Sequence, residues 1–302
     1  MGKLRTMIYG IYPRSDSLRV AISRWERGKE TTENLRNAIS VERSEILERF
    51  RKSAEIYTDP CVNWHDIFRP IAGVLDGISP GRLERYTETN TFFRKPVIEK
   101  LPEYDGKRLK QDLPENLPAP YFRIEPGSSL LLPAPYSLYR ASEDTSGVGE
   151  GRFAGAVMDA YAEIAEETGA RKIILREVFP YVSGLPDYAA YLNGRFEVSL
   201  VTKGRVGKTG ASHSGNRFES VIMQDQDIGF AEEAGKVPGI PVIDASNTLL
   251  ESSADARIRA EGIMNERGLK ELIITTSDHL DFLPRVIADR KLAILGEAGA
   301  VL

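Results

Sequence analysis

Short apolar runs alternate with amphipathic stretches along most of the chain. The clearest runs are rich in Ile, Leu and Val and are centred on Ile174, Leu200 and Ile274. Five further runs, each ending in polar, Gly or Pro residues, are centred near Met7, Ile56, Leu131, Phe230 and Ile243. Buried strands of a parallel sheet have this near-continuous apolar character. The pattern therefore predicts eight strands.

The stretches between most of these runs follow the 3.6-residue period of an amphipathic helix. This period predicts helices within the segments 31–57, 151–172, 254–270 and 283–299. Gly169 and Gly268 are placed to end two of these helices in the left-handed conformation. Pro284 fits the first turn of the last helix.

Strands that alternate with helices predict an α/β fold with a parallel sheet, and eight of them favour a closed (β/α)8 TIM barrel. A doubly wound sheet is the alternative, but no G-x-G-x-x-G follows the first predicted strand. The segment from Asp76 to Ser128 is Pro-rich and poorly periodic. We expect it to be an extended excursion between the second and third strands of a single barrel domain covering residues 1–302.

Composition and charge narrow the choice of partner. The chain has 302 residues, a formal net charge of −4 and no long basic run, so nucleic acid is not an expected partner. Its single cysteine, Cys61, excludes an internal disulfide and is typical of a reducing compartment. The first residues lack a signal-peptide pattern, and no apolar run reaches the roughly 18 residues of a membrane helix. We therefore expect a cytoplasmic protein with no membrane partner.

Functional groups of such barrels lie at the carboxyl ends of the strands. The predicted strand ends carry a mixed set of charged and polar side chains, which favours a ligand-binding rim over isolated strand caps. Its members are Arg14, Ser15, Asp59, Cys61, Tyr136, Arg176, Glu177, Thr202, Lys203, Glu232, Asp244, Asn247, Asp278 and His279.

Several segments resemble the cobalamin-independent methionine synthase family, in its short archaeal form or as the metal-free half of its two-barrel form. The stretch YGIYPRSDSLRVAISRWERGKETTENLRNA is similar to the family's first strand end, which has a G-S-[FY]-P-R motif. The stretches TDPCVNWHDIFRPI, LERYTETNTFFRKPV and LLPAPYSLYRAS extend the likeness, and SDHLDFLPRVIADRKL stands where the family has N-P-D-C-G-L. The resemblance implies a (β/α)8 barrel that takes part in methyl transfer to homocysteine, within methionine and amino-acid biosynthesis. The methyl donor it implies is of folate or corrinoid type.

The resemblance also implies a zinc ion held by one His, two Cys and one Glu, but most of these positions differ here. The His-x-Cys pair falls on Val201 and Lys203, neither of which ligates zinc. The Glu falls on Glu232, and the last Cys falls on Asp278 or His279. His213 is a candidate for a displaced ligand, so zinc is expected only if Glu232, His279 and His213 form the set. A surface-loop position is the alternative for His213.

The positions that hold the amino group of homocysteine in the family differ as well. Its second-strand Glu becomes Cys61, and its fourth-strand Asp becomes Arg176, while the adjacent Glu177 is kept. An arginine at this position would repel an ammonium group and attract an anion. We expect Glu177, Lys203 and Arg176 to be the catalytic residues.

Expected substrate contacts are the remaining polar or aromatic residues near the predicted strand ends. They are Arg14, Ser15, Cys61, Trp64, Asp66, Arg94 and Asp244. Burial in the core is the alternative for Trp64 and Cys61.

Two hypotheses about function follow. In the first, the chain is a zinc-free counterpart of a separate catalytic methionine synthase barrel, which would be its partner. In the second, it is an independent methyltransferase with altered metal ligands or a different thiol or anionic substrate. Lys203 and Glu177 would then serve as charge stabiliser and acid–base group without a metal.

Overall fold

The computed structural model describes residues 2–85, 92–114, 116–181, 188–192, 194–204 and 218–300. The contacts between residues divide the chain into two compact units. As far as they are described, the first unit contains Met1–Val62, Glu125–Ser129 and His213–Leu302, and the second contains Asn63–Ile124 and Leu130–Ser212. None of the helices within the described ranges is long and apolar enough to cross a membrane.

Five parallel strands form the sheet of the first unit. They are β1 (Lys3–Ile8), β2 (Ile56–Tyr57), β9 (Phe218–Ile222), β10 (Gly235–Ile243) and β11 (Glu271–Thr276). Their order in the sheet is β2-β1-β11-β10-β9, with parallel pairing between neighbours. Most residues of β1, β9 and β11 are buried, as expected for strands covered on both faces.

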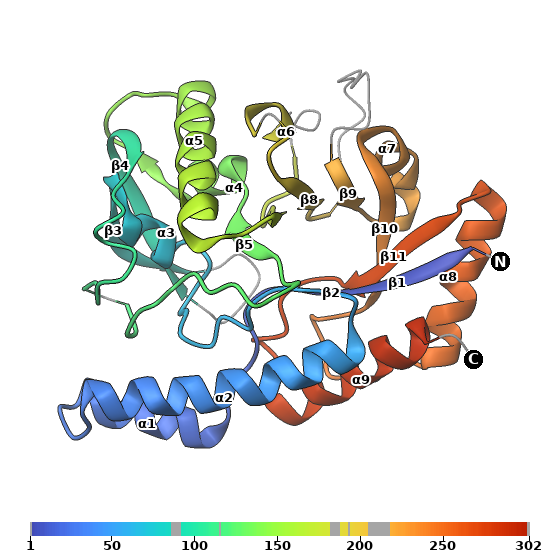
Figure 1. The fold of residues 1–302 in the computed structure, drawn as a ribbon, viewed down its shortest axis with the longest axis horizontal. Helices are drawn as coiled ribbons and strands as arrows, with labels where there is room; N and C mark the ends of the chain where they lie inside the picture. The colour runs from blue at the N-terminus through green and yellow to red at the C-terminus, as the bar shows by residue number, and fades with distance from the viewer. Residues whose placement is uncertain are drawn as a thin grey trace. The chain divides into compact units, whose positions relative to one another are not determined.

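Helices of the first unit begin and end at side chains that suit their positions. The side chain of Thr31 accepts a hydrogen bond from the Asn34 amide and caps the start of the helix Thr32–Ser53. Gly268, with φ +66°, ends the helix Ser253–Arg267. Figure 1 shows α2 (Thr32–Ser53) and α9 (Arg285–Gly299) running below β1, and α9 contacts both α2 and β1. The bounds are α1 (Asp16–Glu26), α2 (Thr32–Ser53), η1 (Asp225–Asp227), α7 (Ile228–Ala234), α8 (Ser253–Arg267) and α9 (Arg285–Gly299).

Three more parallel strands lie in the second unit. They are β5 (Leu130–Pro133), β7 (Lys172–Arg176) and β8 (Glu197–Val201), in the order β8-β7-β5. The helices of this unit are α3 (Arg69–Val74), α4 (Pro135–Ala141), α5 (Glu150–Thr168) and α6 (Tyr188–Tyr191). The buried face of α5 packs on β4 (Phe92–Tyr104).

The predicted excursion between the second and third parallel strands is confirmed, and it has a regular structure. It contains an antiparallel hairpin of β3 (Leu75–Arg85) and β4 (Phe92–Tyr104), with β6 (Glu143–Asp144) parallel to β4. The pairing of β3 with β4 shifts register twice. These irregularities and the prolines of both strands break the two-residue alternation, so the sequence pattern does not reveal the hairpin.

The strand predicted near Phe230 is wrong, because this segment forms α7. Its buried residues Ile228, Ala231 and Ala234 recur every three positions, which is a helical spacing. The sixth parallel strand is β9, which lies earlier in the chain. The other seven predicted strands and the four predicted helices are confirmed.

Beyond the named strands, one parallel bridge joins Thr58, after β2, to Ser129, before β5. The Ser129 amide also donates a 2.8 Å hydrogen bond to the Tyr57 carbonyl. Eight parallel strands with intervening helices give the predicted α/β class. The single domain over residues 1–302 stays a prediction.

Candidate functional site

Four charged or titratable side chains follow β1 and β11 in the first unit, and we call them the β11 cluster: Arg14, Asp278, His279 and Asp281. The Oδ1 atom of Asp281 is buried and accepts no hydrogen bond within the described residues. The pKa of Asp281 is raised to about 7, mainly by burial and also by the neighbouring charge of Asp278, while the charge of Arg14 opposes both effects. Asp281 is therefore protonated for part of the time near neutral pH, as an acid–base group would be.

The ring of His279 is held against the end of β1. It is 5% exposed and meets the ring of Tyr9 edge to face, with 5.8 Å between centroids. Gly10, with φ +93°, passes so close that a Cβ atom there would lie 2.3 Å from His279 Cδ2. Only glycine fits this position, so the backbone that follows β1 holds the ring in place.

Hydrogen bonds hold the backbone on both sides of Arg14. The Pro13 carbonyl accepts a 3.1 Å bond from Arg285 Nη1, and the Ser15 amide donates a 2.6 Å bond to Glu42 Oε1. Arg14 Nε donates to the Val62 carbonyl at 2.7 Å. Burial lowers the pKa of Arg14 to about 10, which leaves it a partly desolvated cation at neutral pH. Ser15 itself caps α1, because its side chain accepts a hydrogen bond from a backbone amide of the first turn.

A second group, the Glu177 cluster, lies after β7 in the second unit and consists of Glu177, Ser137, Tyr181 and Tyr188. Glu177 is fully buried. Its Oε1 accepts hydrogen bonds from the hydroxyls of Tyr181 and, at 3.0 Å, of Tyr188. Its Oε2 accepts from the Ser137 hydroxyl and, at 3.1 Å, from the Ser137 amide.

These four donors stabilise the ionised form of Glu177, but burial outweighs them. Burial raises the pKa of Glu177 to about 7, while the hydrogen bonds from Ser137, Tyr181 and Tyr188 hold it down. The carboxyl group can therefore release or take up a proton near neutral pH. Its donors also fix its orientation, which suits a positioned acid–base group or a structural anchor for α4.

The other two predicted catalytic residues lie near the ends of β7 and β8. The guanidinium of Arg176 is fully buried, and its Nη1 donates a 2.7 Å hydrogen bond to the Thr202 carbonyl. Lys203 is half-buried in the segment after β8. Arg176 therefore places a positive charge inside the second unit, where the resemblance implies an acid.

Cys61 is buried and adopts φ +48°, a conformation that a side chain with a Cβ rarely adopts. Its amide donates a 2.9 Å hydrogen bond to Asp59 Oδ1, and its thiol donates to the Asp59 carbonyl at 3.2 Å. Asp59 is held in turn by an ion pair with Arg43. Strained backbone of this kind concentrates at ligand sites, so the loop after β2 stays a candidate for substrate binding.

Trp64, Asp66 and Arg94 stabilise the excursion in the second unit. Trp64 is 2% exposed, and its Nε1 donates a 2.9 Å bond to the Tyr121 carbonyl. Asp66 accepts bonds from two backbone amides at the start of α3, and from Arg69 Nε at 3.2 Å. Arg94 donates from Nη1 to the Gly81 carbonyl at 3.2 Å. Each of these three side chains therefore has a structural contact, and their binding role stays a prediction.

Asp244 organises the turn after β10. Its Oδ1 accepts bonds from the amide and hydroxyl of Ser246, at 2.8 and 2.7 Å, and its Oδ2 accepts from Asn247. Burial opposes ionisation, but the bonds from Ser246 and the charge of Lys291 hold the pKa of Asp244 below its usual value. Asp244 is thus an ionised turn residue.

Two of the three predicted zinc ligands, Glu232 and His279, lie among the described residues. Glu232 lies on α7 and forms a 2.6 Å ion pair with Arg267, and His213 lies outside the described residues. Within the described part of the chain, no three His, Cys, Asp or Glu side chains are grouped so that they could hold a metal ion. Zinc binding by Glu232, His279 and His213 stays a prediction.

Four residues of the two clusters are not among the functional residues predicted from the sequence: Asp281, Ser137, Tyr181 and Tyr188. The sequence does point to Asp281, because it closely follows the predicted residues Asp278 and His279. Tyr181 and Tyr188 follow Glu177 by only 4 and 11 residues, but no periodic pattern marks their hydroxyls as its partners. Ser137 lies 40 residues from Glu177 and reaches it only through the fold.

Comparison with known proteins gives a likeness in structure. No family model matches the chain, and no curated protein matches it. Among solved structures it resembles a B12-independent methionine synthase from Shewanella sp. W3-18-1 in complex with selenomethionine. The TM-score is 0.66 at 11% sequence identity, over 90% of this chain and 89% of that chain. The likeness confirms the predicted barrel fold.

Proposed function

We propose that this chain takes part in methyl transfer to homocysteine as the zinc-free counterpart of a separate catalytic barrel. The observation that carries the proposal is the buried Arg176 at the end of β7, in a fold that resembles a methionine synthase. The resemblance implies a carboxylate there to hold the ammonium group of homocysteine. A fully buried guanidinium repels that group, so homocysteine is bound and activated on the partner barrel.

In this proposal the chain contributes binding of the methyl donor, which is of folate or corrinoid type. Arg14, with its pKa lowered to about 10 by burial, remains a cation in the first unit. A desolvated guanidinium is suited to the carboxylates of a polyglutamate tail. The proposal gives Arg14 this role.

Reconstitution tests the proposal. The chain, a Cys-bearing barrel protein from the same organism, and a mixture of both are incubated with homocysteine and 5-methyltetrahydropteroyl-polyglutamate or methylcobalamin. We expect methionine to form in the mixture at a rate above that of the Cys-bearing barrel alone. An Arg14→Gln variant should lower this gain, whereas Arg36→Gln, on the exposed face of α2, should not. Methionine formation that is independent of this chain would overturn the proposal.

A second candidate is an independent enzyme that works without a metal, and the pKa of Glu177 near 7 favours it. Glu177 would act as the acid–base group and Lys203 as the charge stabiliser. Methyl transfer from the donor to a thiol by the chain alone would decide for it. This activity should be abolished in Glu177→Gln and kept in Glu163→Gln, on the exposed face of α5. Absence of turnover by the chain alone would decide against it.

A further inference from the structure

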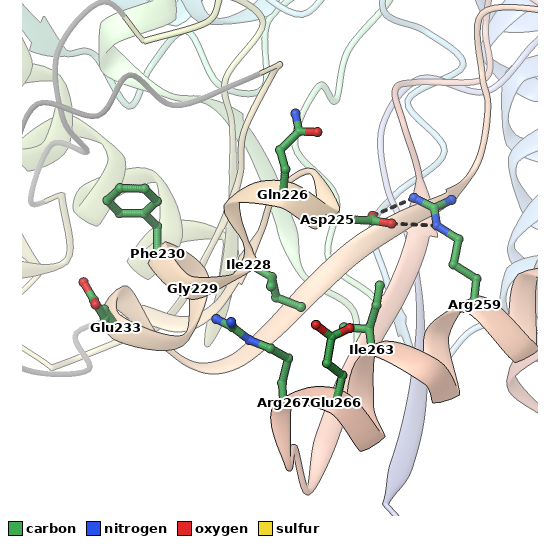
Figure 2. A pocket seen from close by; sticks show the side chains of 10 residues that line it. All are labelled: Asp225, Gln226, Ile228, Gly229, Phe230, Glu233, Arg259, Ile263, Glu266 and Arg267. Carbon is green, nitrogen blue, oxygen red and sulfur yellow. Dashed lines mark hydrogen bonds and ion pairs between the residues drawn. The ribbon is translucent and has the colours of Figure 1, made fainter.

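A pocket of about 550 Å³ lies between η1, α7 and α8 in the first unit (Figure 2). Its size falls within the range of small-molecule sites. None of its lining residues belongs to the β11 cluster. They are Asp225, Gln226, Ile228, Gly229, Phe230, Glu233, Arg259, Ile263, Glu266 and Arg267.

Both arginines of the pocket are already engaged by carboxylates. Arg259 makes a two-pronged ion pair with Asp225, with N–O distances of 2.7 and 2.6 Å, drawn as dashed lines in Figure 2. Arg267 pairs with Glu232 on α7 at 2.6 Å. The two pairs tie η1 and α7 to α8 and neutralise the positive charge, so the pocket is not prepared for an anion.

Two other carboxylates of the lining are not neutralised. Glu233 on α7 and Glu266 on α8 are exposed and form no ion pair with any described residue. Glu266 acts on Arg267 only as a more distant charge, which helps to raise the pKa of Arg267. With three carboxylates against two guanidinium groups, the lining favours a cation.

Apart from Gln226, the rest of the lining is apolar. Ile228 is buried, Ile263 and Phe230 are half-buried, and Figure 2 shows Phe230 and Glu233 on the same helix. Aliphatic side chains cover methylene groups, and the face of a phenyl ring attracts an ammonium group. The lining therefore combines carboxylates that have no ion pair among the described residues with apolar side chains.

We propose that this pocket binds an aliphatic polyamine, a short hydrocarbon chain that carries ammonium groups. Glu233 and Glu266 bind the ammonium groups, and Ile228, Ile263 and Phe230 contact the chain between them. This site goes beyond the proposed function and does not depend on it.

The test uses 1,5-diaminopentane as the probe and the full chain labelled at isoleucine methyl groups. We expect saturable shifts of the Ile228 and Ile263 methyl signals, which 1,5-pentanediol, of the same length but uncharged, does not cause. The double variant Glu233→Gln/Glu266→Gln should weaken binding roughly tenfold, as expected for the loss of two exposed charge contacts. Glu297→Gln, an exposed glutamate on α9 outside the pocket, is the matched control and should bind as the wild type does.

Three results would overturn the proposal. They are equal shifts with the diol, shifts that sodium chloride reproduces at the same ionic strength, and an affinity that the double variant leaves unchanged. Each result would mean that Glu233 and Glu266 do not bind the ammonium groups of the probe. Since methyl transfer is not measured, failure of this test leaves the proposed function unaffected.

Discussion

At the scale of single residues, buried groups are placed by backbone features as much as by side-chain contacts. His279 is fixed because Gly10 has no Cβ, and Glu177 is fixed because four donors surround it. Both features can be tested by single substitutions.

Replacing Gly10 by alanine should destabilise the fold by about 2–4 kcal/mol, because the new Cβ meets the His279 ring and φ is +93°. Gly28→Ala is the control, since Gly28 has φ +68° but open space around it, and its cost should be about 1 kcal/mol. Urea unfolding measures both. The double variant Gly10→Ala/His279→Ala should cost less than the sum of its parts. Equal costs for Gly10 and Gly28 would contradict the described contact.

Glu177 should make stability depend on pH. Its pKa is about 7 in the folded state against 4.5 as the ordinary value, so the folded state holds the proton more tightly. The resulting stabilisation is fully present below about pH 4.5 and is lost as pH rises through 7. At about 1.4 kcal/mol for each unit of pKa difference, the loss is about 3 kcal/mol.

Urea midpoints at pH 5 and pH 7.5 measure this dependence. In Glu177→Gln the fall in stability between the two pH values should be smaller than in the wild type. Glu163→Gln should follow the wild type, because Glu163 is exposed on α5. If Glu177→Gln also follows the wild type, Glu177 is ionised across this range and the assigned pKa is wrong.

At the scale of elements, α9 holds the loop after β10 through a buried lysine. Lys291 is fully buried, and its Nζ donates to the Leu249 carbonyl at 2.5 Å and to both Glu251 oxygens at 2.8 and 2.9 Å. Glu251 in turn accepts a 2.8 Å bond from the Asp244 amide. Lys291 thus anchors the loop that carries Asp244 to α9.

Lys291→Met should cost about 3 kcal/mol, because it leaves Glu251 without its cation. Hydrogen exchange should show faster exchange at the Asp244 amide in this variant. Arg290→Met, at the exposed neighbouring position on α9, should change neither quantity by much. Unchanged exchange at Asp244 in Lys291→Met would show that the anchor does not hold the loop.

Element by element, the apolar pattern predicts the parallel strands well, because both faces of each are buried and the runs are nearly continuous. The apolar pattern does not predict the secondary structure of segments that are buried on one side only or irregularly. The run near Phe230 is a short helix with buried residues at every third position, and β3 and β4 are interrupted by bulges and prolines. Arg14 and Asp278 lie in the segments that follow β1 and β11. The sequence could not show that Ser137 and Tyr188 converge on Glu177, since that depends on the packing of distant segments.

Across the whole molecule, a fold that resembles a methionine synthase carries Cys61, Arg176 and Lys203 where the resemblance implies carboxylate and zinc ligands. In the proposed function, the zinc and the activated thiolate therefore belong to a different polypeptide. This proposal concerns the side chains of this chain and can be tested on the purified protein.

The test is elemental analysis of the purified chain after incubation with excess zinc, beside a His279→Ala variant. We expect zinc well below one equivalent per chain, with no difference between the two proteins. One equivalent of zinc, lost in His279→Ala, would overturn the proposal and identify an independent zinc site in this chain.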